Sequence, residues 1–190
     1  MKVLLAVTGS VAAKLTSKLI VELKNAGHEV RLVGTESCKH FVKDQMDDAG
    51  DLEGAIIYFD ADEWYRYKSV SKVLHIDLVK WCDVMLIAPL TANTLAKIAN
   101  GICDNLVTCC ARALPEGKPM IIAPAMNTQM WNHPITSIQL KELFGRGVYM
   151  CEPVEKKLYC GDTGVGAMAD IKDIVSVVGI IEQRHGAKEV

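Results

Sequence analysis

The sequence predicts one α/β domain, built on a doubly wound, mainly parallel sheet with helices on both faces. Short apolar runs alternate along the chain with stretches of helical period. The apolar runs are nearly continuous, as in strands that are buried on both faces. The chain has 190 residues, of which 50% are hydrophobic, and no linker or repeat interrupts it, so we expect a single domain over 1–190.

The expected elements follow one another as strand and helix. Strands are predicted at 2–8, 28–35, 82–90 and 118–125, with weaker strands at 55–59 and near 147–151. Helices are predicted at 11–27, 92–100, 103–114, 134–144 and 170–184. Residues 60–72 are polar and aromatic, and we expect them to form an excursion outside the sheet.

Composition argues against several classes of protein. The formal net charge is −2, which makes nucleic acid an unfavoured partner. No apolar run approaches the roughly 18 residues of a membrane helix, and the opening "MKVLLAVTGS" is interpreted as a first strand instead of a signal peptide. The seven cysteines form no CxxC pair and no zinc-ligand spacing, so we expect no metal site. Several cysteines lie in apolar runs, which favours buried free thiols in a reducing compartment, the cytoplasm.

Four of the predicted strands end in small or polar residues. These ends read "TGSVAA" (8–13), "GTES" (34–37), "PLTANT" (89–94) and "PAMNTQMW" (124–131). Ligands of open α/β sheets bind at the carboxyl ends of the strands, so we look for the functional site there.

The first and third strand ends each have two interpretations. The turn at Gly9, Ser10 and Val11 could hold a phosphate with its backbone N–H groups and the Ser10 hydroxyl, or it could be a tight turn only. It matches neither the GxGxxG dinucleotide motif nor the P-loop. In "PLTANT", Thr91, Asn93 and Thr94 offer more hydrogen-bonding groups than one helix cap needs, although a cap remains an alternative.

Two further residues are candidates for chemistry. Asn127 follows a strand and could bind a ligand or cap the next helix, while its neighbours Met126, Met130 and Trp131 could form core or an interface. His75 has apolar neighbours and nearby acids, so it ranks first among the five histidines for proton chemistry. The other four are expected at turns or on the surface.

The segment "CGDTGVGAM" places Cys160 before three glycines. Glycine is used where a chain must bend or move, so a mobile loop is expected at about 155–167. The alternative is an Ω-like surface loop with an incidental cysteine.

Taken in order, five stretches resemble the FMN-containing cysteine decarboxylase family. They are "TGSVAA", "HIDL", "PLTANTLAKIANGICDN", "PAMNTQMW" and "CGDTGVGAM", and the similarity runs from about residue 2 to residue 183. The segments "DADEW" (60–64) and "CDNLVTC" (103–109) look most like the animal members that act on 4′-phosphopantothenoylcysteine. The resemblance implies a Rossmann-like or flavodoxin-like flavoprotein domain, bound FMN, and a homotrimer with active sites at subunit interfaces.

The resemblance also implies roles for individual residues. His75 and Cys160 match the family's catalytic histidine and cysteine, and Asn127 should bind the carboxylate of the substrate's cysteine moiety. The residues implied in FMN binding are Gly9, Ser10, Val11, Thr35, Ser37, Phe41, Thr91, Ala92, Asn93, Thr94 and Met126. Two positions depart from the family pattern: Thr91 is serine or aspartate in many members, and Gly34 replaces a larger residue.

The implied reaction removes CO₂ from 4′-phosphopantothenoylcysteine and gives 4′-phosphopantetheine, a coenzyme A precursor. Oxidation of the thiol-bearing carbon gives a thioaldehyde that accepts the electrons of the departing carboxylate, and the resulting enethiolate is then reduced. Cys160 is expected to donate the proton. A non-catalytic regulatory flavoprotein and a peptidyl-cysteine decarboxylase are the two alternatives within the family.

Overall fold

A computed structural model describes residues 1–47, 50–70, 73–157, 161 and 163–186. Its centre is a six-stranded sheet in the order β3-β2-β1-β4-β5-β6, with every neighbouring pair parallel. The strands are β1 (Lys2–Val7), β2 (Glu29–Gly34), β3 (Ile57–Tyr58), β4 (Val84–Leu90), β5 (Met120–Pro124) and β6 (Tyr149–Met150). This strand order is that of the Rossmann fold, and it confirms the predicted doubly wound parallel sheet.

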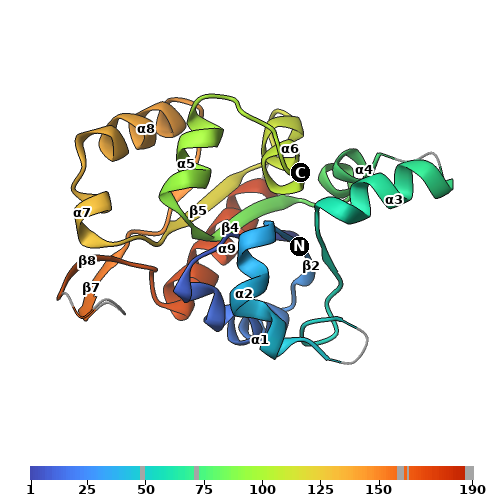
Figure 1. Ribbon diagram of the computed structural model, residues 1–190, viewed down its shortest axis with the longest axis horizontal. Coiled ribbons are helices and arrows are strands. Elements are labelled where there is room, and N and C mark those ends of the chain that lie inside the picture. Colours follow the sequence, from blue (N-terminus) through green and yellow to red (C-terminus); the bar gives the residue numbers. More distant parts are fainter. Residues whose placement is uncertain (48–49, 71–72, 158–160, 162, 187–190) are drawn as a thin grey trace.

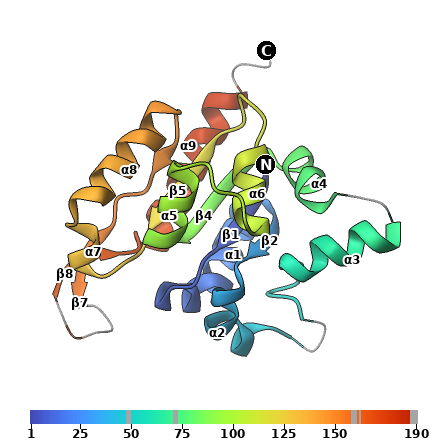
Figure 2. The same ribbon diagram turned by 45° about the horizontal axis from the view of Figure 1, so that its top comes forward.

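Helices cover both faces of the sheet (Figure 1, Figure 2). Side chains of α1 (Thr16–Asn25) and α9 (Ile171–Gly186) share one buried cluster with Val3 and Leu5 of β1. Residues of α4 (Leu74–Trp81), α5 (Ala92–Ala99), α6 (Leu106–Ala113) and α8 (Pro134–Gly145) share a second cluster with Leu4. Successive residues of β1 point to opposite faces, so each buried strand contributes to two cores.

Short elements sit around the ends of the strands. The predicted helix at 11–27 begins as a 3₁₀ helix, η1 (Val11–Leu15), before α1, which ends at Asn25. Beyond β2 come η2 (Glu36–Cys38), α2 (Lys39–Val42) and η3 (Lys43–Gln45), and α7 (Thr128–Trp131) follows β5. An antiparallel hairpin of β7 (Val154–Lys157) and β8 (Thr163–Ala167) stands apart from the main sheet.

The segment expected as an excursion is helical. It forms α3 (Asp60–Val70), which projects from the body beside α4 (Figure 1, Figure 2). Trp64, Tyr65 and Tyr67 are 66%, 72% and 59% exposed, so α3 lacks the buried apolar stripe by which sequence periodicity identifies a helix.

The described cysteines are free thiols, as predicted. Cys38, Cys82, Cys110 and Cys151 are buried, Cys109 is half-buried and Cys103 is exposed, while Cys160 lies outside the described residues. Burial raises the pKa of Cys38 to about 12 and that of Cys82 to about 11, so neither thiol ionises near neutral pH.

The expectation of a turn or surface position was wrong for His28. This residue is 5% exposed and lies 3.3 Å from the N-terminal nitrogen through Nδ1, because the strand it precedes pairs with β1 at the very start of the chain. Among the described helices, none combines the length and apolar character required to span a bilayer.

Candidate active site

Thr8 joins the two central strands at the carboxyl edge of the sheet. Its buried hydroxyl donates to the carbonyl of Pro89 at 2.7 Å and accepts from the backbone N–H of Thr91 at 3.0 Å. Thr8 follows β1 and Pro89 lies in β4, the pair between which the strand order reverses direction. A crevice opens at such a reversal point in doubly wound folds, so Thr8 marks the place where a ligand is expected.

The ends of β1 and β2 meet through Gly9 and Ser37. A Cβ atom on Gly9 would lie 2.3 Å from Ser37 Oγ, so only glycine allows these turns to approach so closely. Ser37 Oγ also lies 3.1 Å from Thr35 Oγ1, and Ser10 Oγ accepts from Ala12 N at 3.3 Å. The structure therefore brings Thr35 and Ser37, two of the residues expected in FMN binding, to the turn at Gly9 and Ser10.

Val11 and Phe41 border this hydroxyl cluster. Val11 begins η1, and Phe41 lies on α2, which packs against η1. Phe41 is half-buried and contacts the core cluster beneath α1, so one part of its side chain remains accessible.

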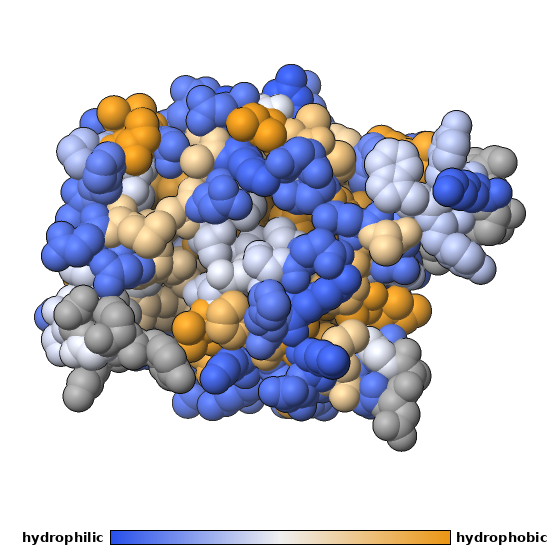
Figure 3. Space-filling model, viewed as in Figure 1, coloured by the Kyte–Doolittle hydropathy of each residue, from blue (hydrophilic) through white to orange (hydrophobic). Residues whose placement is uncertain are grey.

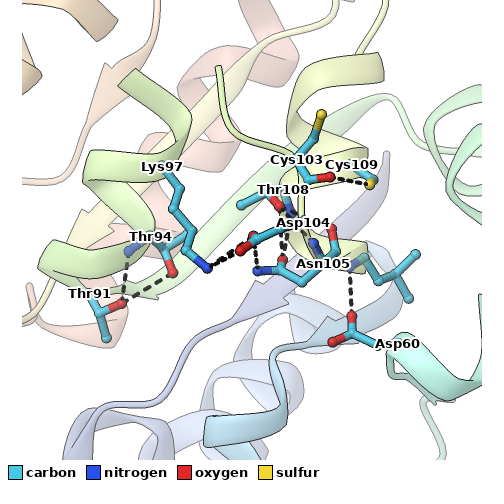
Figure 4. A network of polar contacts seen from close by, with 10 residues as sticks. Asp60, Thr91, Thr94, Lys97, Cys103, Asp104, Asn105, Thr108 and Cys109 are labelled. Atoms are coloured by element: carbon cyan, nitrogen blue, oxygen red, sulfur yellow. Dashed lines mark hydrogen bonds and ion pairs between the residues drawn. The ribbon is translucent and has the colours of Figure 1, made fainter. Parts of the chain in front are cut away.

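Thr91 caps α5 at the end of β4. Its hydroxyl accepts from Thr94 N at 3.4 Å and donates to Thr94 Oγ1 at 3.2 Å (Figure 4). Threonine is an ordinary N-cap residue, so the capping alternative that the sequence left open for this position is present. Thr94 is buried, Ala92 is half-buried and Asn93 is exposed.

A polar network extends from α5 to the projecting helix α3. Lys97 contacts Asp104 at 2.7 Å, Asp104 accepts from Asn105, and Asn105 forms a capping box with Thr108 (Figure 4). At the far end, Asp60 Oδ1 accepts from the backbone N–H of Leu106 at 2.7 Å. The "DADEW" and "CDNLVTC" segments are therefore in direct contact, a pairing that their separation in sequence does not reveal.

Asn127 is the N-cap of α7. Its side-chain oxygen accepts from Gln129 N at 2.8 Å, which is the capping interpretation that the sequence left open. The cap fixes the position of the amide beside the buried Met126. Next to it, the hydroxyl oxygen of Thr128 is buried and makes no hydrogen bond within the described part of the chain.

The β7–β8 hairpin packs directly on this segment. Met126 N donates to the carbonyl of Gly166 at 2.9 Å, and a Cβ on Gly166 would lie 2.4 Å from Met126 O. A Cβ on Gly164 would lie 2.7 Å from Thr128 Oγ1. Gly164 and Gly166, which were expected to give mobility, are thus required for the close approach of the hairpin to Thr128 and Met126. Mobility of the segment stays a prediction.

Cys160 lies outside the described residues, between the two strands of this hairpin. The geometry of the site is therefore defined by residues other than Cys160. Of the described residues that follow it in the sequence, those of strand β8 lie against α7.

His75 lies on α4, away from the residues around Asn127. Its ring Nδ1 is 3.2 Å from Glu63 Oε1, and its backbone N–H donates to Glu63 Oε2 at 3.0 Å. In both views α3 and α4 lie at one end of the molecule, whereas α7 and the hairpin lie at the other (Figure 1, Figure 2). One copy of the chain therefore does not bring His75 to Asn127.

Sequence reasoning missed Thr8, Glu63 and Thr128. Thr8 was quoted within "TGSVAA" but had no role, although a threonine directly after a buried strand is a signal for a link between strand ends. Glu63 stands in "DADEW", twelve residues before His75. Only the tertiary fold shows that the two side chains meet.

The space-filling view shows the side of the molecule that faces the viewer in Figure 1. Hydrophilic side chains dominate it, with smaller apolar areas between them (Figure 3).

Comparison with known proteins shows the family to which the chain belongs. Residues 1–181 match the flavoprotein family, so the chain belongs to the flavoproteins. Phosphopantothenoylcysteine decarboxylase from Mus musculus is 48% identical, over 98% of this chain and 89% of its own length. Within the flavoproteins, the similarity is thus to a cysteine decarboxylase of that substrate class.

Two solved structures share the fold over almost the whole chain. A cysteine-to-serine mutant of PPC decarboxylase complexed with pantothenoylaminoethenethiol has a TM-score of 0.88 at 44% identity, covering 96% of this chain and 98% of its own. The FMN binding protein AtHal3 has a TM-score of 0.84 at 44% identity, covering 96% and 97%. The fold is therefore that of this group of flavoproteins.

Proposed function

We propose that this protein is an FMN-dependent decarboxylase that converts 4′-phosphopantothenoylcysteine into 4′-phosphopantetheine for coenzyme A biosynthesis. The observation that carries the proposal is the 48% identity to a phosphopantothenoylcysteine decarboxylase over 98% of this chain. The chain also keeps the histidine, asparagine and cysteine of the family pattern, as His75, Asn127 and Cys160.

The residues at the strand ends fit FMN. The hydroxyl groups of Ser10, Thr35 and Ser37 gather where Gly9 lets two turns touch, which suits the oxygen atoms of a phosphate. The half-buried Phe41 offers an aromatic surface to a ring, and the capped start of α5 offers polar groups to a ring edge. When bound, FMN supplies the redox chemistry by accepting a hydride from the thiol-bearing carbon and returning it after CO₂ has left.

Asn127 is suited to hold the substrate carboxylate. The hydrogen bond to Gln129 N fixes its side chain in one orientation at the N-terminus of α7. An amide presents N–H donors to a carboxylate without the strong desolvation cost of a charged partner. The carboxylate must lose this partner as it becomes CO₂, so a neutral amide serves the reaction better than a cation would.

Cys160 is proposed to give the final proton to the carbon next to the former carboxylate. A thiol has an ordinary pKa of about 8.5, so it is mostly protonated at neutral pH and able to donate. Strand β8, which follows Cys160 in the sequence, packs against Met126 and Thr128 through Gly166 and Gly164. His75 is assigned to proton transfer or substrate orientation.

The active site is proposed to be shared between copies of the chain in a homotrimer. His75 contacts Glu63, five residues beyond β3, whereas Asn127 follows β5, four strand positions away. Neighbouring strands are about 4.8 Å apart, so β3 and β5 are separated by roughly 19 Å across the sheet. A second copy that supplies His75 to the Asn127 side would complete the site.

Mixing two inactive variants tests this sharing. His75→Asn and Cys160→Ser proteins should be inactive alone and partly active after subunit exchange, because one mixed site then has both residues intact. Exchange is verified with differently labelled chains by native mass spectrometry. Verified exchange without recovered activity contradicts the shared site.

The activity itself is tested with substrate labelled at the carboxyl carbon. The purified yellow protein should release labelled CO₂ from phosphopantothenoylcysteine and little from a peptide ending in cysteine. Release only from the peptide would support a peptidyl-cysteine decarboxylase, and release from neither would support a regulatory flavoprotein.

A further inference from the structure

Glu63 holds His75 at two points. One carboxylate oxygen accepts from the backbone N–H of His75 at 3.0 Å, and the other lies 3.2 Å from the ring Nδ1. The side chains of His75 and Glu63 are only 25% and 16% exposed, so water competes weakly for either contact. Both the backbone and the ring of the histidine are therefore tied to one acid.

The helix turn that carries Glu63 is itself fixed. Asp60 Oδ1 accepts from Leu106 N at 2.7 Å, which joins the start of α3 to the start of α6 (Figure 4). Asp62 Oδ2 accepts from Phe59 N at 2.7 Å. Glu63 follows in the same first turn, where the helix dipole stabilises a negative charge. Asp60, Asp62 and Glu63 thus lie in one short segment, and among the described contacts of these three acids those to His75 are made by Glu63.

We propose that Glu63 is the positioning residue for His75. A carboxylate can only accept hydrogen bonds, so Nδ1 must carry a proton opposite Oε1. In a neutral ring this leaves Nε2 as the unprotonated nitrogen, able to accept a proton from a substrate or to orient it. This inference rests on the proposed decarboxylase function, in which His75 meets the substrate.

The variant Glu63→Gln keeps the shape of the side chain but removes its charge and changes the hydrogen-bond partner of His75 Nδ1. It therefore distinguishes control of the His75 tautomer from simple packing. Its amide oxygen can still accept from the backbone N–H of His75, which leaves the NH₂ group opposite Nδ1. An NH₂ group can only donate, so Nδ1 must become the acceptor and the proton must move to Nε2. Asp62→Asn is the matched control, because it changes a neighbouring acid that does not contact His75.

The test measures the tautomer by ¹⁵N NMR of histidine-labelled protein at pH 9, well above the ordinary histidine pKa of about 6.5. The His75 signals are assigned by their loss in His75→Asn. We expect the Nδ1–H form in the wild type and in Asp62→Asn, and the Nε2–H form in Glu63→Gln. Turnover of Glu63→Gln should fall about tenfold or more, while its flavin content and melting temperature match those of the control.

An unchanged tautomer in Glu63→Gln, or turnover within twofold of Asp62→Asn, would overturn the positioning role. The proposed function fails differently. Wild-type protein that releases no CO₂ while the tautomer still inverts would refute the decarboxylase and leave the Glu63–His75 geometry supported.

Discussion

The backbone N–H of Met126 donates to the carbonyl of Gly166 at 2.9 Å, and this bond fastens the β7–β8 hairpin to the segment that carries Asn127. The hairpin strands flank Cys160, and Met126 directly precedes the proposed carboxylate ligand. One hydrogen bond between main chains thus links the proposed proton donor's segment to the place where the substrate carboxylate is expected.

Gly166→Ala should separate these two segments. Gly166 has a φ of +143°, and an added Cβ would lie 2.4 Å from Met126 O, so the hairpin must move. We expect the free energy that favours the hairpin packed against Met126 to fall by about 1–3 kcal/mol. Turnover should fall at least about fivefold, with FMN content unchanged. Steady-state kinetics and flavin absorbance measure both. Gly179→Ala, in open space on α9, is the control, and equal turnover in the two variants would contradict the prediction.

The variants Asn127→Asp and Asn127→Ser should distinguish the capping role of Asn127 from its proposed role in substrate binding. Both replacements cap α7 as asparagine does, so the melting temperature should change by only about a degree or two. Aspartate places a negative charge against the substrate carboxylate, and serine removes the amide donor. We expect KM to rise about tenfold or more for serine and further for aspartate. Equal KM values in all three proteins would leave Asn127 with its capping role alone.

Gly34→Ala should destabilise the fold without touching the site chemistry. An added Cβ would lie 2.6 Å from Phe59 Cε1 and 2.8 Å from Cys38 Sγ, so any side chain at this position would collide with both residues. We expect a loss of about 1–3 kcal/mol in the free energy of unfolding, measured with urea.

The control for this stability prediction is Gly145→Ala at the end of α8, where nothing lies within 4 Å. It should be neutral or slightly stabilising. A Gly34→Ala protein as stable as this control would show that Phe59 and Cys38 move aside freely.

His28 should make the protein less stable in mild acid. Burial, followed by the nearby N-terminal ammonium group, lowers the pKa of His28 in the folded state. The unfolded chain therefore binds a proton more readily, so this contribution is complete above about pH 6.5 and is lost as the pH falls through the lowered folded pKa. Urea unfolding at several pH values should show His28→Gln with a flatter decline than wild type. His40→Gln, at an exposed position, should keep the wild-type decline; an identical decline in all three proteins would contradict the assignment.

The sequence predicted the sheet and the helices that cover it because their residues repeat with strand or helix period. It could not predict α3 as a helix, since Trp64, Tyr65 and Tyr67 are exposed and leave no buried stripe. The strand-end candidates were predicted because all parallel strands end at one edge. Glu63 was missed because its contact with His75 depends on how two helices pack. The separation of His75 from Asn127 was likewise set by strand order, which sequence periodicity does not encode.

The most direct test of the account is the product formed without oxygen. The proposed reaction is redox-neutral, because the hydride taken from the substrate is returned to it. Purified protein with phosphopantothenoylcysteine under argon, with no added reductant or oxidant, should give many turnovers per flavin, with equal amounts of CO₂ and phosphopantetheine by mass spectrometry. A reaction that stops after one turnover per flavin, with a product two mass units lighter than phosphopantetheine, would contradict it.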